Sequence, residues 1–82
     1  MEVEINNIIE KNFPVKKRQK VNNLINSITL DHVMAQSEYN LYNTRMAVLH
    51  LANGDLNQIK EMVVAAKQDF RDVIMSANNG SI

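Results

Sequence analysis

Apolar residues recur at helical spacing along most of this sequence, and the first two such stretches predict helices over residues 2–12 and 14–28. The boundary lies at Phe13-Pro14, because a residue that precedes proline is disfavoured in the helical region. Proline itself is accepted in the first turn of the following helix. The apolar positions of these two helices are Ile5, Ile8 and Ile9, and then Val21, Leu24, Ile25 and Ile28.

A third helix is predicted over residues 37–53, with Ser37 as its N-cap and Asn53-Gly54 as its end. Its apolar residues cover more than half of its circumference, which is typical of a central helix. They are Leu41, Tyr42, Met46, Val48, Leu49, Leu51 and Ala52. The segment 29–37 before it is less regular, and either Thr29 or Asp31 can cap a short helical turn there.

The last predicted helix spans residues 55–78, with Asp55 as its N-cap. Its apolar residues alternate at spacings of three and four: Leu56, Ile59, Val63, Ala66, Phe70, Val73 and Ala77. We expect Val63 and Phe70 to be fully buried, with Leu24 and Leu49 opposite them. Together the four helices predict an all-α fold, a compact four-helix bundle-like single domain over residues 1–82.

Composition adds few constraints on function. The 82 residues suffice for one small domain, and the nine acidic and nine basic residues give no net charge that would predict a partner. The sequence has no cysteine, which fits a reducing compartment. Its longest apolar run, residues 62–66, is far shorter than the ~20 residues of a membrane span. The acidic start of the chain is unlike a signal peptide. We therefore expect a cytoplasmic protein with no membrane span.

One cluster of like charges stands out: Lys16, Lys17, Arg18 and Lys20. The cations lie in the first turns of the second predicted helix, where the helix dipole disfavours each by ~0.3–1 kcal/mol. They are candidate residues for binding an anion or an acidic partner, protein or nucleic acid. Against this, they point in several directions and do not form one stripe, as expected of a solvated helix end.

Arg45 lies within the apolar arc of the third predicted helix, where an unpaired cation would be costly. We expect a structural ion pair with Asp69 or Asp72 of the last helix. Asp69 is six residues out of register with Arg45 across the turn, about 9 Å along the axis, so Arg45 can instead reach the first or second helix. An alternative role is to hold an anionic ligand. Lys60, Lys67 and Arg71 follow one edge of the last helix, where cations usually pair across to a neighbour or lie in water.

Catalytic and metal-binding patterns are not found. His32 and His50 are far from the spacing of about four residues that a helical zinc site needs. There is no nucleophile elbow and no glycine-rich phosphate loop. We therefore expect no catalytic residues, no metal and no cofactor.

Two blocks in the C-terminal half resemble a group of small, uncharacterised bacterial helical proteins. The first is Arg45-x-Ala47-Val48-Leu49-x-Leu51-Ala52-x-Gly54-Asp55-Leu56, and the second is Asp69-Phe70-Arg71-Asp72-Val73-Ile74. The resemblance covers roughly residues 41–77, and it implies an all-helical fold without an established activity.

The sequence as a whole favours a non-catalytic protein-interaction or accessory module that is a monomer or a weak dimer. The alternative is a weak, salt-sensitive nucleic-acid binder that uses the basic cluster at residues 16–20.

Overall fold

The computed structural model describes residues 2–79, and this range contains helices and turns but no strand. The α-helices are α1 (Glu2–Asn12), α2 (Val15–Asn26), α3 (Glu38–Ala52), α4 (Leu56–Gln68) and α5 (Phe70–Asn79). Two single 3-10 turns, η1 (Leu30–His32) and η2 (Met34–Gln36), connect α2 to α3. The all-α class is confirmed. The count of four helices is wrong, because the last predicted helix is broken into two.

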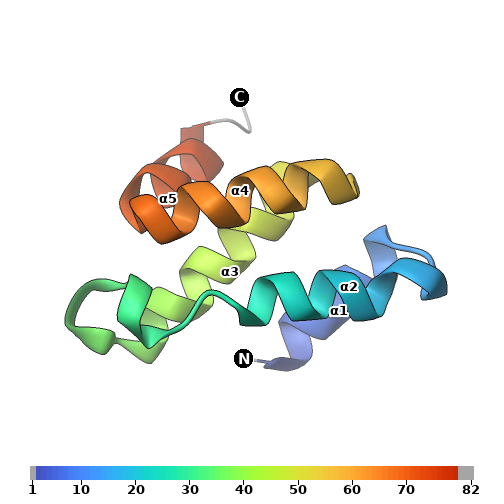
Figure 1. The fold of residues 1–82 in the computed structure, drawn as a ribbon, viewed down its shortest axis with the longest axis horizontal. Helices are drawn as coiled ribbons and strands as arrows, with labels where there is room; N and C mark the ends of the chain where they lie inside the picture. The colour runs from blue at the N-terminus through green and yellow to red at the C-terminus, as the bar shows by residue number, and fades with distance from the viewer. Residues whose placement is uncertain (1, 80–82) are drawn as a thin grey trace.

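The helix α3 occupies the centre of the molecule, as its wide apolar arc predicts, and it contacts α1, α4 and α5. Helices α2 and α4 contact each other and run in the same direction across the view of Figure 1, with α1 packed against α2. Helix α5 turns back from the end of α4 and packs against α3.

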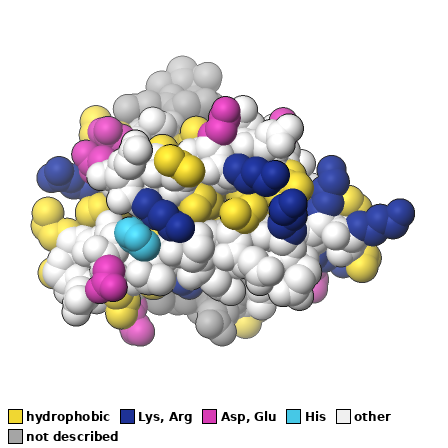
Figure 2. Space-filling model, in the orientation of Figure 1, with side chains coloured by type: hydrophobic (Ala, Val, Ile, Leu, Met, Phe, Trp, Pro, Cys, Tyr) yellow, Lys and Arg dark blue, Asp and Glu magenta, His cyan; other side chains and the backbone are white. Residues whose placement is uncertain are grey.

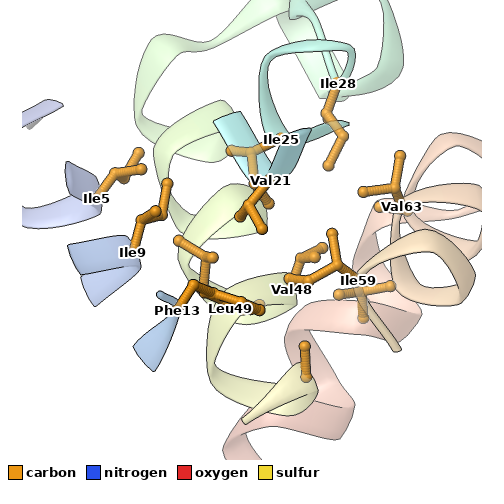
Figure 3. Packing of buried hydrophobic residues seen from close by; sticks show 14 residues of the cluster. Ile5, Ile9, Phe13, Val21, Ile25, Ile28, Val48, Leu49, Ile59 and Val63 are labelled. Atoms are coloured by element: carbon orange, nitrogen blue, oxygen red, sulfur yellow. The ribbon is translucent and has the colours of Figure 1, made fainter. Parts of the chain in front are cut away.

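The hydrophobic core is built mainly by the four helices α1 to α4 (Figure 3). Phe13 and Ile28 from the connecting segments and Val73 from α5 complete it. Its largest fully buried side chains are Ile9, Val21, Ile25, Ile28, Val48, Leu49 and Ile59. Leu49 and Val63 are buried, as expected. Leu24 is only half-buried and packs against the edge of the core.

The break between α4 and α5 occurs at Asp69, whose backbone is extended (φ −156°, ψ 97°). Its N–H donates to the carbonyl of Ala65 at 2.9 Å, the last such bond of α4. Its carboxylate accepts a hydrogen bond from the backbone N–H of Arg71 at 3.1 Å, which is the bond that an N-cap makes to the second residue of a helix. Asp69 therefore ends α4 and caps α5.

The break explains why the expectation for Phe70 is wrong. Phe70 is the first residue of α5 and is half-buried. It lines a shallow hollow with His32 and Met34 instead of continuing the stripe of α4 into the core. Val73, one turn further on, is the residue of α5 that enters the core.

The turn between α3 and α4 combines two left-handed residues, Asn53 (φ 49°) and Gly54 (φ 84°). A Cβ on Gly54 would lie 3.1 Å from the backbone oxygen of Asn12, at the end of α1. Glycine is needed here for its conformation and also because α1 approaches the turn closely. The cap that follows is formed as predicted, with the Asp55 carboxylate accepting from the N–H of Asn57 at 2.8 Å.

We expect Gly54→Ala to lower the free energy of unfolding by about 1–3 kcal/mol, from the strain of positive φ and the contact with Asn12. Asn53→Gly is the matched control in the same turn, and it should change stability by no more than a few tenths of a kcal/mol. Urea titration of both variants measures the difference. Equal stability of Gly54→Ala and the wild type would contradict the close approach of α1.

We expect Asp69→Ala to destabilise the fold by about 0.5–2 kcal/mol through loss of the α5 cap. Asp69→Asn retains an acceptor for the N–H of Arg71 and should keep most of the stability. The side-chain ion pair of Asp69 with Arg71, at 3.4 Å, is exposed and contributes little. Thermal unfolding followed by circular dichroism distinguishes the variants, and equal losses in both would show that the charge matters and the cap does not.

Candidate functional site

Arg18 is the member of the predicted basic cluster whose side chain is half-buried and points toward the rest of the molecule. Its Nε donates to the carbonyl of Phe13 at 3.0 Å, and its Nη2 donates to the carbonyl of Glu10 at 3.0 Å. Carbonyls at the C-terminal end of a helix lack partners within the helix and carry partial negative charge, so a cation there is favourable. Arg18 thus links the end of α1 to the start of α2 by hydrogen bonds, a structural role that the sequence pattern does not predict.

Lys16, Lys17 and Lys20 are exposed. Helix α2 contains no acidic residue, and within residues 2–79 none of the three lysines pairs with a carboxylate. These lysines therefore remain the accessible part of the cluster predicted from the sequence.

Arg45 points toward α1 and α2, away from the α4–α5 corner. Its Nε and Nη2 both donate to the carbonyl of Ile28, at 3.2 and 2.7 Å. Beside it is a hollow of about 210 Å³ that is also lined by Ile5, Asn6, Asn22 and Asn26.

The predicted contacts of Arg45 with Asp69 or Asp72 are therefore not formed. Asp69 is bonded to Arg71 at the start of α5, and Asp72 is exposed on α5. Arg45 instead reaches the Ile28 carbonyl, just beyond α2.

The exposed lysines of α2 lie on one side of that helix, and Arg18 lies on the other side. Taking about 100° per residue, Arg18 and Asn22 fall on the side of Val21 that faces α1, as their contacts with α1 residues show. Lys17 and Lys20 fall on the opposite side, together with the half-buried Leu24. Because α2 packs chiefly between α1 and α4, this second side borders α4.

Helix α4 has a matching set of lysines. Lys60 and Lys67 are exposed and two helical turns apart. Val64 lies between them along the helix and is 56% exposed. In Figure 2, Lys and Arg side chains form a band across the face where Figure 1 places α4 and α2, with hydrophobic side chains among them. We call this surface the α2–α4 basic face: Lys17, Lys20, Leu24, Lys60, Val64 and Lys67.

A hollow of about 470 Å³ lies between α3 and α5. Its lining includes Tyr39, Asn43, Met46, His50 and Ile74. Tyr39 and His50 are its titratable side chains, and no carboxylate is among the lining residues. The arrangement offers polar and apolar contacts, with no acid to orient or activate His50.

Elsewhere, the described residues contain no group of three or more His, Asp or Glu side chains that could hold a metal ion. The pKa of the Glu4 carboxyl is lowered, chiefly by a backbone hydrogen bond at the start of α1. None of the helices in residues 2–79 is long and apolar enough to cross a membrane.

No protein-family model, curated protein or solved structure matches this sequence. The resemblance to small bacterial helical proteins therefore stands on the two sequence blocks alone.

We expect Arg18→Met to lower the free energy of unfolding by about 1–2 kcal/mol, because two carbonyls at the end of α1 lose a charged donor. Lys17→Met, at the preceding position of the same helix, removes one positive charge from an exposed side chain and should change stability by less than about 0.5 kcal/mol. Parallel urea titrations compare the two. Equal effects would contradict the separation of Arg18 from the accessible lysines.

Proposed function

We propose that this chain is a non-catalytic protein-interaction module that binds an acidic partner through the exposed lysines of α2. The observation that carries the proposal is the set of three accessible lysines, Lys16, Lys17 and Lys20, without a carboxylate partner in the described residues. Their position in the first turns of α2 is unfavourable with the helix dipole. A cluster that costs stability and forms no ion pair within residues 2–79 is well suited to an external anionic partner.

The alternative function is weak, salt-sensitive binding of nucleic acid through the same lysines, whose charges suit phosphates as well as carboxylates. An acidic protein is the preferred partner, since the chain carries no excess of positive charge and only four aromatic residues, and single strands are commonly bound on aromatic stacking platforms. The proposal includes a cytoplasmic location, no cofactor, and a monomer or weak dimer.

Crosslinking in the native cell tests the proposal. The wild type should yield specific protein crosslinks that Lys16→Glu/Lys17→Glu/Lys20→Glu loses by about tenfold, the equivalent of ~1.4 kcal/mol. Lys11→Glu is the matched control, since it reverses an exposed lysine on α1, and it should retain the crosslinks.

Two results would count against the proposal. Identical crosslinked proteins from the wild type and the triple variant would remove the α2 lysines from the interface. Recovery of nucleic acid alone, with an affinity that falls steeply as salt is added, would favour the alternative function.

A further inference from the structure

The structure brings together two groups of lysines that are about forty residues apart in the sequence. Lys17 and Lys20 come from α2, and Lys60 and Lys67 come from α4. All four are exposed, and within residues 2–79 none of them has an ion-pair partner. The two helices pack directly against each other. Exposed like charges are thus gathered beside one helix–helix seam.

The helical register places both groups toward that seam. Helices α2 and α4 run in the same direction over a shared core. When two parallel helices lie side by side on one core, the flank that faces the neighbour is rotated one way from the buried stripe in one helix and the other way in the other helix. Counted at 100° per residue, Lys17 and Lys20 are rotated by about −40° and −100° from the buried Val21. Lys60 and Lys67 are rotated by about +100° and +80° from the buried Ile59. The predicted facing flanks agree with the band of dark-blue side chains in Figure 2.

Apolar side chains lie close to these lysines. Leu24 and Leu56 are half-buried, and Val64 is 56% exposed. From Lys60 to Lys67 the distance along the axis is about 10 Å, two turns of helix. The apolar strip formed by Leu24, Leu56 and Val64 therefore lies among the lysines of both helices, with Val64 on the outer side of Lys60 and Lys67.

We propose that the α2–α4 basic face binds an acidic amphipathic helix of a partner protein. A helix with an apolar stripe and flanking Asp or Glu residues matches this face in both respects. Its stripe would cover Leu24 and Val64, and its flanking carboxylates would meet the lysines of α2 and α4. Helices commonly dock in this way, by three or four apolar anchors along one face. This inference rests on the proposed function. It adds α4 to the interface and specifies that the bound segment of the partner is helical.

The apolar strip is the reason to prefer a helix over nucleic acid. A phosphate backbone can neutralise the lysines but offers nothing apolar to cover Val64. The strip is aliphatic, so it also lacks the aromatic side chains on which unpaired bases stack. An amphipathic helix uses both features of the face.

The test is fluorescence anisotropy with the full chain and a labelled designed helix of about four turns. This peptide carries leucines at positions i, i+3, i+4 and i+7, with glutamates on both flanks. A second peptide has the same composition in shuffled order, and a third probe is a thymidine oligonucleotide. We expect the designed helix to bind about tenfold more tightly than the shuffled peptide.

Variants of the two helices then separate this inference from the proposed function. Lys60→Glu/Lys67→Glu and Lys17→Glu/Lys20→Glu should each weaken binding of the designed helix by about tenfold. Val64→Ser should weaken it several-fold, while Met75→Ser should not, although Met75 is as exposed (59%) and lies on α5. Circular dichroism of each variant checks that the fold is retained.

Each contrary outcome has a distinct meaning. If only the α2 double variant weakens binding, the proposed function survives and the shared α2–α4 site is overturned. Equal binding of the designed and shuffled peptides would show that the face recognises negative charge alone, and it would overturn the helix as the preferred ligand. Tighter binding of the oligonucleotide, weakened by salt, would assign the face to nucleic acid, and no binding of any probe would overturn the inference.

Discussion

The bend at Asp69 is the constraint on which the arrangement of the other helices depends. A straight helix over residues 55–78 would be about 36 Å long, longer than the largest dimension of the molecule, 34 Å. Breaking it lets α5 fold back onto α3 and bring Val73 into the core. Helix α4 keeps its own buried stripe against α3 and lies beside α2. The bend thus converts one amphipathic segment into two shorter helices that serve one small core.

The arginines and the lysines of this chain have different roles: the arginines form hydrogen bonds within the molecule, and the lysines are exposed. All three arginines of the sequence donate hydrogen bonds within the molecule: Arg18 to the end of α1, Arg45 to the Ile28 carbonyl, and Arg71 to Asp69. All six lysines are exposed. A planar guanidinium presents several donors and can bridge two carbonyls or hold one through two nitrogens, whereas an ammonium is more strongly hydrated. The lysines are therefore the cations left for an external partner.

Much of the fold could be predicted from the sequence, because local signals determine it. Pro14, Ser37 and Asp55 mark helix starts through their own backbone or side-chain bonds, and Asn53-Gly54 marks an end by its left-handed conformation. The break at Asp69 was hidden, because the apolar spacing of three and four continues across it. An aspartate is a weak signal inside a helix and a strong one at a cap, and only packing decides which role it takes.

The candidate site was less predictable, since it depends on which helices become neighbours. Lys60 and Lys67 read as an ordinary solvated edge until α2 is placed beside α4. Arg18 reads as one more cation of a cluster, because its acceptors are backbone carbonyls that every sequence has. Arg45 has the same ambiguity, and its acceptor at Ile28 is seventeen residues away. A hydrogen bond from a side chain to a backbone carbonyl cannot be predicted by searching the sequence for a partner of opposite charge, because every residue has a carbonyl.

The bend at Asp69 is tested most directly by an NMR study of the full chain that follows the backbone through Asp69 and the contacts of α5. We expect helical medium-range contacts to stop at Asp69 and to resume after Phe70. We also expect contacts between the side chains of Ile74 and Met46, which line the same α3–α5 hollow. Uninterrupted helical contacts through Asp69, with no contact between Ile74 and α3, would contradict the bend.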